Sequence, residues 1–422
     1  MKMDRVILGE NAVYSTDCRE TGINNNILVV GSSCCGKTMS ISEPLFLECE
    51  NSSLIATVTK RRIVKKYKSL FWMRGYEVLD LDLTDPGGSD AAFDPMAYVH
   101  TSADMTLLAE SIVMANPKKH KTTADPFWDD SSISLLSAEI AYVKELDPRG
   151  TFAEVLMVHD ALEFTEKEGS LYTTLDNCFK DLKDKNPHSF AAKCWDSFHR
   201  LPLKTAQCVY GTLNSVLDTI FTPEIRRMVS RRRSVDFHRL ASKKTVLFVT
   251  TSPVNHAQKY FANLFYSQMF KSLFEFGESR PDGRLPVPVR VLCDDFATGS
   301  KIPEFAELIS IFREKQISVT LLLQSESQLE QMYGSDEATT IINNCDTIVY
   351  MGGMDLMTAR SMSQRLNVPL DEVLYMPLGR IHILRRGARP LTTARYDISR
   401  DKRYQKITRQ YEENLRNRPP EF

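Results

Sequence analysis

The chain has 422 residues, of which 42% are apolar and 25% charged, so it has room for two or three globular domains. Its formal net charge of -1 excludes a general attraction to nucleic acid, and any such surface must be a local patch. Nine cysteines without a Cys-x-x-Cys pair indicate reduced thiols rather than disulfides or a zinc site, and the longest apolar runs, such as Val319–Leu323, are far shorter than the ~18 residues of a membrane span.

The N-terminal part of the chain alternates between predicted strands and helices. A buried strand at Ile27–Val30 is followed by the string GSSCCGKT and then by a helix that Pro44 is expected to kink. A second strand at Leu54–Thr57, a basic helix at Arg61–Arg74 and a third strand at Glu77–Leu81 come next. This order favours an α/β fold with a parallel sheet.

The pattern becomes mostly helical between residues 96 and 232, without a clear strand. Apolar residues at helical spacing predict one amphipathic helix there: Ala206, Val209, Leu213, Val216, Leu217 and Ile220. Strands then return as β-branched runs at Thr245–Thr250, Val289–Cys293, Ile317–Leu323 and Thr347–Met351. We therefore predict an all-helical domain at 96–232, inserted between two parts of a nucleotide-binding domain at 1–95 and 233–422.

The string GSSCCGKT fits the phosphate-binding pattern G-x-x-x-x-G-K-[ST], and its residues are Gly31, Ser32, Ser33, Cys34, Cys35, Gly36, Lys37 and Thr38. The backbone amides would face phosphate oxygens, Lys37 would reach the β- and γ-phosphates, and the Thr38 hydroxyl would bind Mg²⁺. The motif thus predicts ATP and Mg²⁺ as cofactors. Cys34 and Cys35 stand where glycine or serine is common, which leaves either a strained loop or two thiols small enough to be tolerated.

A second acidic site follows the strand Val289–Cys293. In P-loop NTPases an Asp at the end of a strand beside the loop holds Mg²⁺, a role that suits Asp294, and Asp295 could act as general base on the attacking water. Gln324 ends the next strand and is either a residue that orients water or a surface amide. Arg313 is either a solvated charge or an arginine finger for a neighbouring subunit.

Longer motifs carry a family resemblance: DPFWDD at Asp125–Asp130, KIPEF at Lys301–Phe305, LLLQS at Leu321–Ser325, YGSDEATTIINNCDT at Tyr333–Thr347 and GGMDLMTA at Gly352–Ala359. From about Gly22 to Asp397 the chain resembles the TraG/TraD-like coupling proteins of type IV secretion and conjugation. The resemblance implies a RecA-like P-loop NTPase with an inserted all-helical domain. It assigns the Walker B aspartate to Asp294, the strand-end glutamine to Gln324 and the arginine finger to Arg313.

The resemblance implies a homo-hexameric ATPase at the inner face of the bacterial cell membrane. Such a ring would recruit a relaxase–DNA complex and drive single-stranded DNA, or protein, to the secretion channel. The family's N-terminal membrane helices do not occur in this sequence, so we expect membrane contact only through partners or through a missing N-terminal segment.

The chain departs from the family pattern at several positions. Asp295 replaces the usual Glu, the loop has fewer glycines, and Val58–Arg62 replaces Asp-Pro-Lys-Gly-Glu. These departures leave two functions open: an ATP-hydrolysing transfer motor, or a hydrolytically weak nucleotide-binding adaptor of the same apparatus. An unrelated P-loop kinase is disfavoured because nothing marks a small-substrate lid.

A run of basic residues at the C-terminal end of the helical segment is a candidate for DNA contact: Arg226, Arg227, Arg231, Arg232 and Arg233. Such clusters neutralise phosphates without reading sequence. The alternative is a solvated face balanced by nearby acids.

Overall fold

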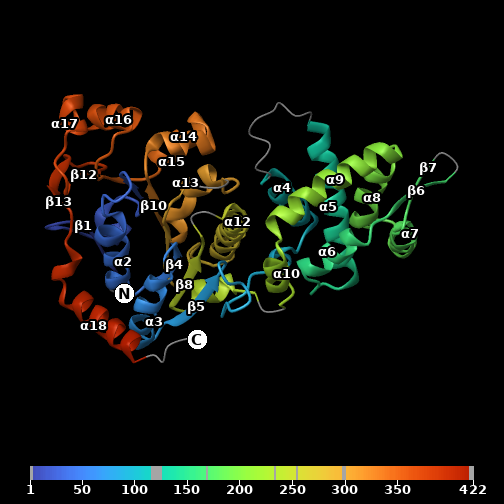
Figure 1. The fold of residues 1–422 in the computed structure, drawn as a ribbon, viewed down its shortest axis with the longest axis horizontal. Coiled ribbons are helices and arrows are strands. Elements are labelled where there is room, and N and C mark those ends of the chain that lie inside the picture. The colour runs from blue at the N-terminus through green and yellow to red at the C-terminus, as the bar shows by residue number, and fades with distance from the viewer. Residues whose placement is uncertain are drawn as a thin grey trace. The chain divides into compact units, whose positions relative to one another are not determined.

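The computed structural model describes residues 3–115, 126–167, 170–231, 234–252, 255–296 and 301–417 (Figure 1). The chain forms two compact units, the first made of Met1–Asp80, Asp236–Thr251 and Met269–Phe422 and the second of Leu81–Val235 and Ser252–Gln268. The boundaries at residues 80 and 268 fall inside a strand and a helix, β5 (Glu77–Asp82) and α12 (His256–Glu278). The three-part division predicted above stays a prediction.

A nine-stranded sheet with the order β13-β12-β11-β3-β10-β9-β4-β8-β5 forms the centre of the first unit. The remaining strands are β3 (Ile27–Val30), β4 (Ser53–Val58), β8 (Thr245–Thr250), β9 (Val289–Cys293), β10 (Ile317–Leu323), β11 (Thr347–Tyr350), β12 (Arg380–Arg385) and β13 (Leu391–Ala394). From β11 to β8 successive neighbours are parallel, whereas β12 and β13 are antiparallel. The predicted α/β fold with a mostly parallel central sheet is confirmed.

Each of the seven predicted strands is present, with ends that differ by at most one residue. The sequence did not predict β12, β13 or the antiparallel pair β1 (Arg5–Gly9) and β2 (Ala12–Ser15). Only one residue of β2 is buried and none of β13, so neither strand has the buried apolar run by which the other strands were recognised.

Helices of the first unit follow the strands. They are α1 (Cys18–Thr21), α2 (Glu43–Glu48), α3 (Arg61–Met73), α11 (Phe237–Ser242), α13 (Phe305–Lys315), α14 (Glu326–Tyr333), α15 (Ser335–Asn343), α16 (Leu356–Leu366), α17 (Leu370–Leu374) and α18 (Lys402–Arg416). A π-helical turn at Thr38–Ser42 precedes α2, whose first turn contains Pro44. The helix therefore changes type close to Pro44, which lacks a backbone donor, and the kink expected at this residue stays a prediction.

The second unit is mainly helical, with α4 (Ser102–Met114), α5 (Pro126–Leu146), α6 (Phe152–Asp160), α7 (Asp176–Lys185), α8 (Phe190–His199), α9 (Leu203–Ile220) and α10 (Pro223–Val229). All six apolar residues that predicted an amphipathic helix are buried on α9. One detail of the prediction is wrong. A hairpin of β6 (Phe164–Lys167) and β7 (Ser170–Thr173) interrupts the span expected to contain helices alone, because its short strands mix polar and apolar residues and give no strand signal.

No helix within the described residues combines the length and apolar character needed to cross a membrane.

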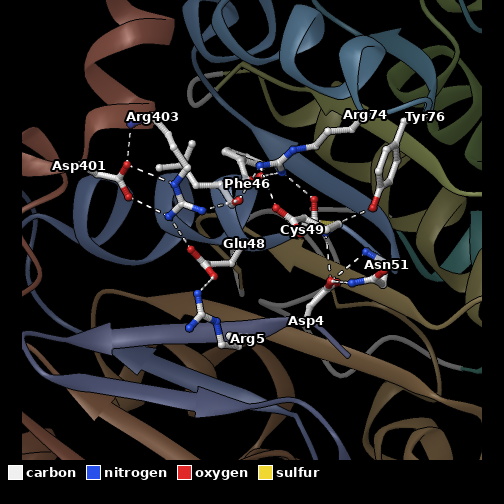
Figure 2. A network of polar contacts seen from close by, with 12 residues as sticks. Asp4, Arg5, Phe46, Glu48, Cys49, Asn51, Arg74, Tyr76, Asp401 and Arg403 are labelled. Carbon is white, nitrogen blue, oxygen red and sulfur yellow. Dashed lines mark hydrogen bonds and ion pairs between the residues drawn. The ribbon is translucent and has the colours of Figure 1, made fainter. Parts of the chain in front are cut away.

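Charged side chains fasten the C-terminal helix to the helix that follows the phosphate loop (Figure 2). The buried carboxylate of Glu48, at the end of α2, accepts hydrogen bonds from Arg403 of α18 at 2.5 Å and from Arg5 of β1 at 3.3 Å. Arg403 also donates to Asp401, the N-cap of α18. Arg74 donates to the backbone carbonyls at the end of α2. Segments far apart in sequence thus meet at one carboxylate.

We predict that Arg403→Ala lowers the free energy of unfolding by about 1–2 kcal/mol, because Glu48 stays buried while losing its best-placed donor. Arg409→Ala, which removes an exposed charge from the same helix, serves as the control. Urea denaturation followed by circular dichroism measures the difference. Identical midpoints for the two variants would show that the Glu48 pair does not hold α18.

Candidate nucleotide site

Two backbone hydrogen bonds fix the start of the phosphate loop to the carboxyl edge of the sheet. The Gly31 amide donates to the carbonyl of Leu323 at 3.1 Å, and the Ser32 amide donates to that of Gly352 at 2.9 Å. A Cβ on Gly31 would lie 2.7 Å from the Cys35 sulfur, so only glycine fits here. The loop is therefore held between the ends of β10 and β11.

The two cysteines of the loop have different surroundings. Cys34 is exposed and adopts a φ of 65°, a left-handed conformation that costs a non-glycine residue about 1 kcal/mol or more. Cys35 packs against the hydrophobic core as a small apolar residue. The sequence left open whether the two cysteines strain the loop or are small enough to fit it. The structure shows a strained backbone at Cys34 and a well-packed side chain at Cys35.

Lys37 is buried, and its ammonium donates to the backbone carbonyls of Gly31 at 2.5 Å and Ser32 at 3.1 Å. Within the described ranges it forms no ion pair. A buried ammonium without a carboxylate partner is costly, because neutral carbonyls replace only part of its hydration. The loop therefore holds a positive charge that a bound anion would neutralise.

Asp294 directly follows β9 at the same edge. The sequence analysis expected β9, the strand before Asp294, to lie next to the phosphate loop. In the structure, β10 lies between β9 and β3, the strand that leads into the loop. Leu321 of β10 pairs in register with Leu28 of β3 and with Cys293 of β9. Burial and the neighbouring Asp295 raise the pKa of Asp294 to about 6, while the ammonium of Lys37 acts in the opposite direction. The carboxylate is thus mostly ionised at neutral pH and lies within electrostatic reach of the loop lysine.

The other predicted residues at this edge are Asp295 and Gln324. Asp295 adopts a left-handed φ of 54° in a turn directly after Asp294, and the next residue, Phe296, donates its amide to the carbonyl of Leu322 at 3.0 Å. Gln324 is exposed at the end of β10, one residue after the carbonyl that accepts from Gly31. The fold thereby gathers the loop, both aspartates and the glutamine at the carboxyl ends of neighbouring strands, where α/β sheets bind ligands.

Arg313 lies at the opposite edge of the sheet. It belongs to the last turn of α13, which leads into the start of β10, and the seven residues of β10 then span roughly 20 Å before Gln324 is reached. One chain therefore does not bring Arg313 to its own phosphate loop.

The basic run belongs to the second unit, and its described arginines form ion pairs or hydrogen bonds with other residues of that unit. Arg226 forms ion pairs with Asp160 and Asp218. Arg227 pairs with Glu224 at 3.8 Å. Arg231 donates to the backbone carbonyls of Pro86, Gly87 and Ser89. Arg232 and Arg233 lie outside the described residues, and DNA contact by this run stays a prediction.

Sequence reasoning missed two cations beside the loop. The guanidinium of Arg395, just after β13, donates to the Cys35 carbonyl at 2.9 Å, and its Nη1 would lie 2.6 Å from a Cβ on Gly36. The charge of Lys60, after β4, lowers the pKa of Asp294 against the effect of burial. A contact across 360 residues has no local sequence signal, so Arg395 could not have been found without the fold.

The residues at this edge fit a magnesium ion that arrives with a nucleotide. Thr38 and Asp294 offer hydroxyl and carboxylate oxygens, the ligands that Mg²⁺ prefers. Among the described residues no group of three or more His, Cys, Asp or Glu side chains could hold a metal by itself. Phosphate oxygens and water would have to complete the coordination, as is usual for magnesium-bound nucleotides.

The fold and the phosphate loop at the carboxyl edge of the sheet define a P-loop α/β protein. A match to a family profile identifies the protein family. The profile described as "Type IV secretory system Conjugative DNA transfer" matches residues 2–367. The chain therefore belongs to this family of conjugative DNA transfer proteins, as the sequence motifs predict. A search of curated proteins finds no match.

Solved structures share the fold. The bacterial conjugative coupling protein TrwBdeltaN70 in its unbound monoclinic form has a TM-score of 0.66 and 17% identity, covering 94% of this chain and 88% of that one. The plasmid coupling protein TrwB in complex with ADP and Mg²⁺ has a TM-score of 0.63 and 16% identity, covering 88% and 86%. VirB4 of Thermoanaerobacter pseudethanolicus has a TM-score of 0.57 and 10% identity, covering 94% and 97%.

We predict that magnesium-dependent nucleotide affinity falls below about pH 6. Asp294 takes up a proton as the pH drops through its raised pKa and thereby loses the charge that attracts the ion, with roughly a tenfold loss per pH unit below it. Nucleotide titrations with and without Mg²⁺ at pH 5 and pH 7.5 measure the effect. Asp294→Asn controls for protonation of the nucleotide itself, and an equal pH response in this variant would contradict the assignment.

Proposed function

We propose that this protein is an ATP-dependent coupling protein that recruits a relaxase–DNA complex and drives DNA or protein into a type IV secretion channel. The observation that carries the proposal is the buried ammonium of Lys37, which forms no ion pair within the described residues and lies within electrostatic reach of Asp294, in a chain of the conjugative DNA transfer family. The fold shared with a TrwB structure that holds ADP and Mg²⁺ supports the choice of cofactor.

The proposed roles follow from the positions of the residues. The amides of Gly31–Thr38 and the ammonium of Lys37 bind the phosphates, while Thr38 and Asp294 hold Mg²⁺, which when bound offsets the negative charge of the phosphates. Asp295 accepts a proton from the attacking water, and Gln324 orients that water. Arg313 acts on the nucleotide of a neighbouring subunit in a homo-hexamer, since it lies far from its own loop.

A hydrolytically weak recruitment adaptor is the second candidate, and two observations favour it. Asp295 is one methylene shorter than glutamate and sits in a left-handed conformation, and Cys34 strains the loop. Both features act on turnover more than on nucleotide binding, so binding and hydrolysis must be measured separately.

Replacing Lys37 with alanine tests nucleotide binding. We expect Lys37→Ala to weaken ATP–Mg²⁺ binding at least tenfold in calorimetry, because charge-assisted hydrogen bonds to the β- and γ-phosphates are lost. Lys65→Ala, which removes an exposed lysine of α3, should bind like the parent. Equal affinities for the parent and both variants would remove the basis of the proposal.

Replacing Asp295, the candidate general base, with the longer glutamate distinguishes the ATP-hydrolysing motor from the hydrolytically weak adaptor. If the general-base distance limits turnover, Asp295→Glu should raise steady-state ATP hydrolysis several-fold at unchanged ATP affinity. Asp295→Asn is the matched control and should hydrolyse no faster than the parent. A rate for the glutamate variant at or below that of the parent would mean that Asp295 is not what limits hydrolysis.

The position of Arg313 predicts a shared active site. Specific ATPase activity should rise with protein concentration as rings assemble, and Arg313→Ala should abolish this rise while ATP binding stays near normal. Mixing Lys37→Ala with Arg313→Ala protomers should restore part of the activity, because each supplies the half that the other lacks. Activity independent of concentration, together with an inactive mixture, would reduce Arg313 to a surface charge.

A further inference from the structure

A cavity of about 490 Å³ opens at the amino edge of the central sheet, within the first unit. Its walls include the beginnings of β9 and β10, the loop before β9 and the segment around α1. The phosphate loop lies at the carboxyl ends of these strands, so this cavity is a separate site. Its volume is in the range of small-ligand pockets.

Four arginines line the cavity: Arg19, Arg284, Arg290 and Arg313. Within the described part of the chain, none of their guanidinium groups forms an ion pair or a hydrogen bond. The lining contains two carboxylates, Asp17 and Glu314. Asp17 caps α1 by accepting from the Arg19 backbone amide at 2.9 Å. The cavity wall therefore carries more positive than negative charge.

Arg290 is the residue that distinguishes this cavity from an exposed basic patch. Its side chain projects from β9, it is only 7% exposed, and its Nη1 is buried without a hydrogen-bond partner. Asp4 is a buried carboxylate of this region, but it accepts hydrogen bonds from the backbone amides of Glu50, Asn51 and Ser52 and forms no ion pair with Arg290. A buried guanidinium in this state is costly unless an anion occupies the cavity.

We propose that this cavity is a binding site for a small anion with several negative charges, of the chemical class of a diphosphate. Arg290 would contact the anion from within, and Arg19 and Arg284 would close around it. Planar guanidinium groups bind phosphate oxygens bidentately, and a volume of about 490 Å³ suits a small anion rather than a polymer.

Calorimetry with inorganic pyrophosphate tests this site in the full chain. All variants carry Lys37→Ala, so that the phosphate loop does not contribute and the result is independent of the proposed ATPase. Arg290→Met should weaken pyrophosphate binding roughly tenfold or more, and so should Arg284→Gln, which replaces a half-buried residue. Arg280→Gln removes an exposed arginine from the same loop outside the cavity and should leave binding unchanged.

A stability measurement separates binding from a purely structural role of Arg290. Without anion, Arg290→Met should melt at the same temperature as its parent or higher, because an unpaired buried charge has been removed. Pyrophosphate should raise the melting temperature of the parent and not that of this variant. Equal pyrophosphate affinity in the Arg280, Arg284 and Arg290 variants would overturn the proposal. Displacement of pyrophosphate from the cavity by a thymidine oligonucleotide would assign the site to nucleic acid and overturn it as well.

Discussion

The buried ammonium of Lys37 is the constraint on which the candidate nucleotide site depends. Its hydrogen bonds go to two carbonyls of the loop itself, so within the described residues the charge is held in place without an ion pair. This is possible because Gly31 lets the loop close tightly and because backbone hydrogen bonds tie Gly31 and Ser32 to β10 and to Gly352. Hydrogen bonds that hold the start of the loop in place before phosphates bind reduce the conformational freedom that binding would cost.

The order of the sheet gives its two edges different roles. The loop, Asp294 and Gln324 lie together at the carboxyl ends of the parallel strands. Arg313, in the last turn of α13, lies at the amino ends of these strands. Residues proposed to act on one nucleotide are thus separated by the length of β10. If all of them act, they must come from different copies of the chain, which is why the proposed motor requires a ring. The unpaired arginines around Arg290 lie at this same amino edge.

The sequence predicts the buried parts of this fold well and the exposed parts poorly. Strands such as β3 and β10 consist of buried apolar residues that leave a clear pattern, and the loop motif fixes the position of Lys37. By contrast, β13 is polar and exposed, and β6 and β7 mix polar and apolar residues, so their pairing depends on tertiary context. The contact of Arg395 with the loop, and the location of Arg290 in a cavity, arise from residues far apart in sequence and have no local signal.

A crystal structure of this protein with a non-hydrolysable ATP analogue and Mg²⁺ would test the account most directly. The account predicts that the ammonium of Lys37 leaves the carbonyls of Gly31 and Ser32 for the β- and γ-phosphates. It also predicts that the ion lies between Thr38, Asp294 and phosphate oxygens. A nucleotide bound elsewhere, or a Lys37 side chain that stays on the two carbonyls with the loop occupied, would contradict it.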